Sequence, residues 1–219
     1  MDVELARFNM IEQQVRPWDV LDQEVLDSLL VVKRELFVPP EYEALAFSDL
    51  EIPLNLNGRV TGEFMFPPRV EARILQALDV QVHESVLEVG AGSGYMAALL
   101  ARKARRVTTM DVDAELAAFA SSNLSKAGIG NVEVVHRDGA EVIHDASLLS
   151  DVIVLSGAVD LLPDELINRL NPGGRLLAIV GEAPVMSAEL VTLSHDRQPS
   201  RSKLFETMAK RLLGFPVRD

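Results

Sequence analysis

Short runs rich in β-branched residues alternate with helical runs from residue 85 onward, and this alternation constrains the fold more than any other feature. Strand-like runs occur at residues 86–89, 106–110, 132–135, 152–155, 175–180, 189–193 and 204–209, with helical runs at 95–103, 114–127, 140–143 and 163–170. Such alternation requires right-handed crossovers and a mainly parallel sheet. Pro172-Gly173-Gly174 is expected to turn into the fifth strand. The sequence predicts an α/β fold with a doubly wound sheet.

The first third of the chain has the spacing of helices rather than strands. Leu5, Phe8, Ile11 and Val15 recur at three- and four-residue intervals, which predicts one apolar stripe on a helix that ends at Pro17. A second helix is expected after Asp22 and a third from residue 67 or 68, with a loop over 48–65 between them. Phe8 and Trp18 are expected to pack these helices together. We therefore expect an N-terminal helical extension with a substrate-side loop over residues 1–80 and a cofactor-binding domain over 81–219.

Charge and composition exclude several classes of protein. The 219 residues contain 21 Lys and Arg against 33 Asp and Glu, a net charge of −12, which argues against nucleic acid or an anionic membrane as partner. Without cysteine there is no disulfide framework and no thiolate metal site, and the four histidines are scattered, so no metal is expected. The N-terminus lacks the pattern of a signal peptide, and the apolar runs are too short for a transmembrane helix. A cytoplasmic protein is expected, of unknown oligomeric state.

A glycine-rich loop follows the first predicted strand. The loop runs Glu88-Val89-Gly90-Ala91-Gly92-Ser93-Gly94, and its alternate glycines allow a ligand to lie against bare backbone at a helix N-terminus. Asp111 ends the next strand, where a carboxylate can accept both hydroxyls of a ribose. Glycines alone are weak evidence, since they also shape ordinary turns. The loop and Asp111 together predict a nucleotide-type site.

The loop favours S-adenosylmethionine over the other nucleotide cofactors. A dinucleotide fingerprint needs glycine where Tyr95 stands, and Glu88 would repel a diphosphate but suit a ligand with an ammonium and a sulfonium. No P-loop motif is present, which excludes ATP bound by that route. An NAD-dependent dehydrogenase is a minor alternative.

Two further segments follow later strands and are expected at the same nucleotide-type site as the glycine loop and Asp111. Asp138-Gly139 comes after the third strand, where the carboxylate can accept from an adenine amino group or cap the following helix. The fourth strand ends in Leu155-Ser156-Gly157-Ala158, which places small residues where substrate and cofactor would meet, or forms a tight loop without ligand contacts.

The chain resembles the protein-L-isoaspartate O-methyltransferase family along nearly its whole length. The resemblance rests on VLEVGAGSGYMAALLA (86–101), RELFVP (34–39), SDLEIPL (48–54), the Asn131-Val132 and Asp138-Gly139 segments, and LNPGGR (170–175). It implies a seven-stranded Rossmann-like methyltransferase sheet and methyl transfer to isoaspartyl carboxylates in damaged proteins. It also implies S-adenosyl-L-methionine as cofactor, bound at Glu88, Gly90, Ala91, Gly92, Gly94, Asp111, Asp138 and Gly139.

One segment departs from the family pattern. The family has G-Q-T-I-S-x-P before the glycine loop, with hydroxyl residues that line the substrate site, whereas this chain has GEFMFPP at 62–68. Phe64 and Phe66 therefore occupy the hydroxyl positions, Glu63 replaces an amide, and no catalytic residue is assigned. The acceptor is expected to be a protein or peptide carboxylate or a small molecule. The alternatives are a methyltransferase for a more apolar acceptor and a cofactor-binding module without isoaspartyl activity.

Overall fold

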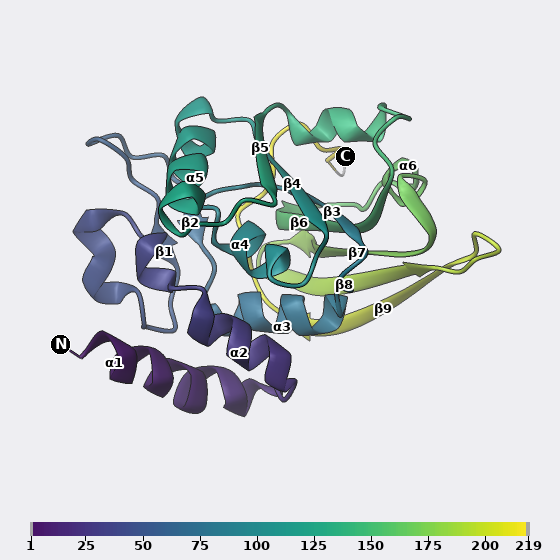
Figure 1. The fold of residues 1–219 in the computed structure, drawn as a ribbon. Coiled ribbons are helices and arrows are strands. Elements are labelled where there is room, and N and C mark those ends of the chain that lie inside the picture. The colour runs from purple at the N-terminus through teal and green to yellow at the C-terminus, as the bar shows by residue number, and fades with distance from the viewer. Residues whose placement is uncertain (1, 218–219) are drawn as a thin grey trace.

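The protein is built around one seven-stranded sheet, described by a computed structural model over residues 2–217 (Figure 1). The strand order is β5-β4-β3-β6-β7-β8-β9; the first five strands are parallel and the last two join antiparallel. The strands are β3 (Ser85–Val89), β4 (Arg106–Asp111), β5 (Val132–His136), β6 (Ser150–Val159), β7 (Leu170–Glu182), β8 (Val185–Leu193) and β9 (Pro199–Glu206). The predicted doubly wound, mainly parallel sheet is confirmed.

Helices cover both faces of this sheet because successive strand residues point to opposite sides. One core cluster joins Val86, Val107 and Val152 to α3 (Pro68–Leu78), α4 (Tyr95–Ala101) and α5 (Ala114–Lys126). The other joins Leu87 and Ile153 to η5 (Gly139–Ile143) and α6 (Asp164–Ile167). This two-sided burial explains why every residue of β3 is buried, rather than every second one.

The N-terminal third forms short helices that lie against α3 and the edge of the α4 layer (Figure 1). They are α1 (Val3–Met10), the π-turn η1 (Ile11–Val15), η2 (Arg16–Trp18), α2 (Gln23–Val31), η3 (Arg34–Leu36) and η4 (Pro40–Leu45), followed by a small sheet of β1 (Ile52–Pro53) and β2 (Phe64–Met65). Residues from this third share the first core cluster with the sheet. The division at residue 80 therefore stays a prediction.

Several sequence-based expectations about packing were wrong. Ile11 and Val15 of the predicted stripe are buried as expected, but Leu5 and Phe8 are 54% and 50% exposed. The π-turn over 11–15 shifts the helical phase, so Met10 joins Ile11 and Val15 on the buried side in their place. Trp18 is also exposed, and it stacks on the Arg69 guanidinium, 4.2 Å from the ring centre.

The last strands also differ from the expected bounds. Residues 172–174 do not precede β7 but form a bulge inside it, between the pairs Ser150–Leu170 and Val152–Arg175. β9 ends at Glu206 instead of continuing to residue 209. It begins at Pro199, so the loop after β8 covers residues 194–198 instead of the whole interval 194–203 between the two strand-like runs. β9 is an edge strand with polar residues on both faces, so it lacks the alternation by which strands are found.

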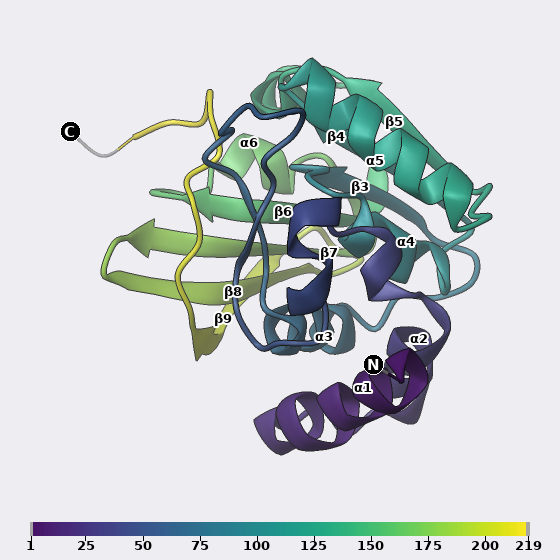
Figure 2. The same ribbon diagram turned by 90° about the vertical axis from the view of Figure 1, so that its left-hand side faces the viewer.

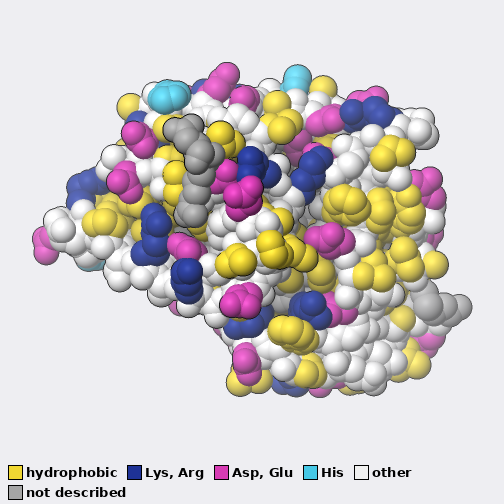
Figure 3. Space-filling model, turned by 180° about the vertical axis from the view of Figure 1, so that it is seen from behind, with side chains coloured by type: hydrophobic (Ala, Val, Ile, Leu, Met, Phe, Trp, Pro, Cys, Tyr) yellow, Lys and Arg dark blue, Asp and Glu magenta, His cyan; other side chains and the backbone are white. Residues whose placement is uncertain are grey.

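After β9 the chain runs along the carboxyl end of the sheet beside the loop that precedes α3 (Figure 2). We call residues 207–213 the C-terminal strap. On the face shown in Figure 3, Lys and Arg side chains lie interspersed with Asp and Glu. No helix within residues 2–217 has the length and hydropathy needed to cross a membrane.

Candidate functional site

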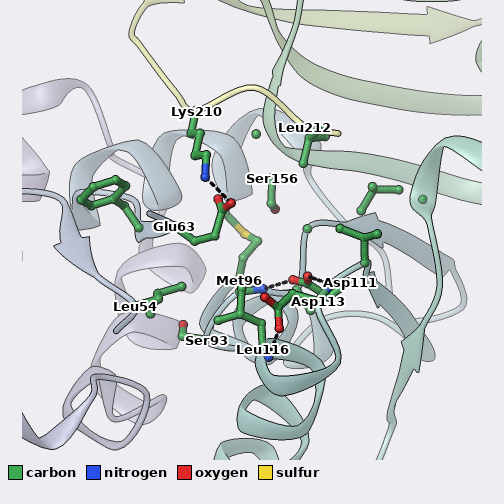
Figure 4. Close-up of a pocket in the computed structure, with 18 of the residues that line it drawn as sticks. Leu54, Glu63, Ser93, Met96, Asp111, Asp113, Leu116, Ser156, Lys210 and Leu212 are labelled. Carbon is green, nitrogen blue, oxygen red and sulfur yellow. Dashed lines mark hydrogen bonds and ion pairs between the residues drawn. The ribbon is translucent and has the colours of Figure 1, made fainter. Parts of the chain in front are cut away.

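A cavity of about 300 Å³ lies beyond the carboxyl ends of β3, β4 and β6 (Figure 4). Strand order reverses between β3 and β6, and in open α/β sheets such a switch point is where ligands bind. The glycine loop, the 61–66 segment and the C-terminal strap close its sides. Of the predicted cofactor-binding residues, those that line the cavity are Glu88, Gly90, Ala91, Gly92, Asp111, Asp138 and Gly139.

The glycine loop is tied to the end of β4. The amides of Gly90 and Ala91 both donate to the carbonyl oxygen of Met110, at 2.8 and 3.0 Å. Gly90 and Gly92 have positive φ angles of 94° and 51°, which explains the need for glycine at these positions. Gly94 is not among the cavity-lining residues. It packs against α5, where an added Cβ would lie 3.1 Å from the Ala120 carbonyl oxygen.

Asp111 connects the glycine loop to α5. One carboxylate oxygen accepts from the Gly92 amide at 2.9 Å and the other from the Asp113 amide at 3.0 Å. Each oxygen keeps a further lone pair for a ligand hydroxyl. Desolvation raises the pKa of Asp111 above its ordinary value, while the two amide hydrogen bonds oppose this shift. The arrangement holds a carboxylate with both oxygens fixed at the cavity wall.

Glu88 is more deeply buried than the sequence suggested. Its side chain is inaccessible to solvent, and its two oxygens accept from the Thr109 and Ser156 hydroxyls, both at 2.7 Å. Desolvation raises its pKa to about 7. Glu88 thus joins β3 to β4 and β6 beneath the cavity, in addition to lining it.

Asp138 caps η5, as one of its two predicted roles requires. Its carboxylate accepts from the Ala140 amide at 2.9 Å and also lines the cavity, so capping and ligand binding are compatible. Gly139 has no room for a side chain, since an added Cβ would lie 2.1 Å from a Val89 methyl carbon. Ser156 and Gly157 from the predicted small-residue segment also line the cavity.

The segment that departs from the family pattern forms the opposite wall. Phe64 lies in β2 and is 45% exposed, whereas Phe66 is 9% exposed and belongs to the core. The carbonyl oxygen of Phe66 accepts from the buried guanidinium of Arg34 at 2.7 Å. Both phenylalanines line the cavity. An apolar wall therefore stands where the family pattern has hydroxyls.

Two features of the site were not predicted from the sequence. Asp113 caps α5 and lines the cavity, and the exposed Arg59 pairs with it at 2.6 Å. The C-terminal strap also lines the cavity. Residues 207–209 were expected to continue the last strand, and residues 210–213 carry no helical or strand periodicity that would have placed them there. Within residues 2–217 no cluster of His, Asp and Glu is arranged to hold a metal.

Comparison with known proteins decides the family. The family model described as protein-L-isoaspartate(D-aspartate) O-methyltransferase matches residues 7–208. The chain belongs to this family of S-adenosylmethionine-dependent methyltransferases. A protein-L-isoaspartate O-methyltransferase from Koribacter versatilis is 35% identical over 96% of this chain and 91% of its own length. One from Aeropyrum pernix is 35% identical over 95% of this chain and 80% of its own.

Solved structures of the same family share the fold. A protein-L-isoaspartate O-methyltransferase from Plasmodium falciparum, solved with S-adenosyl-L-homocysteine, superposes with a TM-score of 0.76 at 17% identity, covering 97% of this chain and 98% of that one. A second structure of that enzyme name gives a TM-score of 0.77 at 22% identity, covering 95% of this chain and 65% of that one. At such identities the likeness establishes the fold alone. It confirms the Rossmann-like methyltransferase sheet that the resemblance implied.

Proposed function

We propose that the protein transfers a methyl group from S-adenosylmethionine to the carboxylate of an isoaspartyl residue in a polypeptide. The observation that carries the proposal is Asp111, fixed by the Gly92 amide at the wall of a cavity at the switch point of the sheet. Membership of the family and the relatives' names support the isoaspartyl acceptor.

The cavity residues fit this cofactor. Gly90 and Gly92 leave bare backbone at the cavity wall, so a ligand can approach the loop closely. Asp111 would hold the ribose hydroxyls, Asp138 the adenine amino group, and the acidic floor at Glu88 would favour the cationic methionine end. When bound, S-adenosylmethionine supplies a methyl group on a sulfonium, whose sulfur keeps the electron pair as the methyl leaves.

The chain's own part is to align the acceptor and exclude water. A carboxylate is ionised at neutral pH, so methylating it needs no general base. Apolar walls at Phe64, Met65 and Phe66 keep solvent from the transfer site, and such positioning contributes much of the rate in bimolecular transfers.

A second candidate is a methyltransferase for a more apolar acceptor. The observation that favours it is the exposed Phe64 ring beside the cavity, in place of a hydrogen-bond donor. A cofactor-binding module without transfer activity would share the cofactor site but would methylate neither kind of acceptor.

Thermal unfolding with different cofactors tests the cofactor part of the proposal. A ligand that binds only the folded state raises the melting temperature. We expect S-adenosylhomocysteine to raise it and NAD to leave it unchanged. No shift with S-adenosylhomocysteine would contradict the cofactor assignment. Transfer of a labelled methyl group to an isoaspartyl peptide then tests the acceptor.

A further inference from the structure

The C-terminal strap is fixed across the cavity by backbone hydrogen bonds to the end of β6. The Ala158 amide donates to the Lys210 carbonyl oxygen, and the Leu212 amide donates to the Ala158 carbonyl oxygen, both at 2.8 Å. Gly157 allows this close approach, because an added Cβ would lie 2.7 Å from the Leu212 side chain. The strap therefore holds the side chain of Lys210 above the cavity (Figure 4). The match to the family model ends at residue 208, before Lys210.

Lys210 and Arg211 are the two cationic side chains among the described residues that line the cavity, and they are held differently. Arg211 pairs at 2.5 Å with Asp160, whose side chain is 3% exposed. Lys210 pairs with Glu63, and these two side chains are 43% and 35% exposed. An ion pair this exposed is worth about 0–1 kcal/mol, so Lys210 can change partner at little cost.

Glu63 lines the cavity on the wall formed by residues 61–66. Lys210 lines the same cavity, so the Lys210–Glu63 pair lies on the cavity side of the strap. Figure 4 shows the pair bridging the cavity from the strap to the segment before α3.

Two hydroxyl groups that line the cavity, those of Thr61 and Ser156, are already engaged as donors. The Thr61 hydroxyl donates to the Leu54 carbonyl oxygen at 2.9 Å, and Ser156 donates to Glu88. Phe64 and Phe66 have no side-chain donor. An acceptor carboxylate in this wall therefore meets Lys210 as the available charged donor.

We infer that Lys210 binds the acceptor carboxylate, taking it in exchange for Glu63. The inference rests on the proposed function, because it assigns a residue to that acceptor. The exchange keeps one anion beside the ammonium while the acceptor is bound. The methyl ester product carries no charge at that group, so Lys210 returns to Glu63 and the product is released.

Two variants with opposite expected effects on the KM for the acceptor test this role. Lys210→Gln removes the cation, and we expect it to raise the KM for an isoaspartyl peptide by about tenfold or more, the loss of one charge-assisted hydrogen bond. Glu63→Gln removes the competing anion, and we expect it to lower that KM. Lys210→Arg should restore most of the affinity. Lys203→Gln, an exposed lysine on β9, is the matched control.

Cofactor affinity and KM together distinguish binding of the acceptor by Lys210 from a purely structural role of the Lys210–Glu63 pair in holding the strap. Both Lys210→Gln and Glu63→Gln should leave the Kd for S-adenosylhomocysteine, measured by calorimetry, at the wild-type value. If the pair only latched the strap, the two variants would impair the enzyme alike, and that result would overturn the inference. An unchanged KM in Lys210→Gln would overturn it too, while leaving the proposed function intact.

Failure of the proposed function gives a different result. If wild-type protein binds S-adenosylhomocysteine but never methylates the isoaspartyl peptide, the acceptor assignment is wrong. Lys210 is then judged by calorimetry with succinate as a carboxylate probe on the S-adenosylhomocysteine-loaded protein. Binding that is lost in Lys210→Gln supports the anchor. Binding that persists in the variant, or is absent in the wild type, overturns it.

Discussion

The guanidinium of Arg34 donates a 2.7 Å hydrogen bond to the carbonyl oxygen of Phe66. Arg34 is wholly buried, and it also donates to the Ala46 carbonyl oxygen at 3.0 Å and pairs with Glu71 on α3. One side chain from η3 thus fixes the wall segment of the cavity to the N-terminal helices. This explains why the RELFVP motif (34–39), which is far from the glycine loop in sequence, matters to the site.

Replacing Arg34 with methionine should destabilise the protein by about 3–5 kcal/mol, because it leaves the buried Glu71 carboxylate without its cation. Urea denaturation measures this loss. The double variant Arg34→Met/Glu71→Gln should lose less than the sum of the two single variants, since the unpaired charge is removed. Strict additivity would show that the two side chains do not stabilise each other.

Asp111→Asn should weaken the binding of S-adenosylhomocysteine by about 10- to 100-fold, because the ligand loses its hydrogen bonds to a charged acceptor. The side-chain amide of asparagine also directs an N–H donor toward either the Gly92 or the Asp113 amide, so one of these two backbone hydrogen bonds is lost. Isothermal titration calorimetry measures the affinity. Asp196→Asn in the exposed β8–β9 loop is the control and should bind as the wild type. Equal affinities for both variants would exclude Asp111 from the cofactor site.

Glu88 should make the folded state less stable as pH rises from about 4.5 to 7. Burial raises its pKa to about 7, so in this range the folded protein holds a proton that the unfolded chain has released. The linked change in unfolding free energy is about 3 kcal/mol. Glu88→Gln cannot titrate, and its stability should fall less across this range.

Urea denaturation at pH 5 and pH 8 measures the effect of Glu88. Glu133→Gln, an exposed glutamate of β5, is the matched control and should keep the wild-type dependence on pH. If Glu88→Gln shows the same loss of stability as the wild type, Glu88 is ionised in the folded protein at both pH values.

Much of the site could be predicted from local patterns in the sequence. The glycine loop and Asp111 could be placed because consecutive parallel strands end at the same edge, and both line the cavity as expected. The burial of Glu88 and the course of the strap could not be foreseen. They depend on Thr109 and Ser156 and on Ala158, residues distant in sequence that sheet pairing brings together. Leu5 and Phe8 were misplaced because a π-turn is not visible in apolar spacing.

The two phenylalanines of the cavity wall should respond differently to serine. Phe66 is buried in the core, so Phe66→Ser should cost about 3–5 kcal/mol of stability. Phe64 is 45% exposed, and Phe64→Ser should change stability little while adding a hydroxyl at the cavity. We expect Phe64→Ser to lower the KM for an isoaspartyl peptide. Thermal melts and steady-state kinetics on both variants check this, and equal stability losses would contradict the assigned burial.

Labelled methyl transfer to a matched pair of peptides tests the central claim most directly. The peptides differ only in having isoaspartate or ordinary aspartate at one position, and binding of S-adenosylhomocysteine is verified on the same sample. We predict labelled methyl ester on the isoaspartyl peptide and almost none on the aspartyl peptide. Label on neither peptide, from protein that binds S-adenosylhomocysteine, would contradict the proposed acceptor.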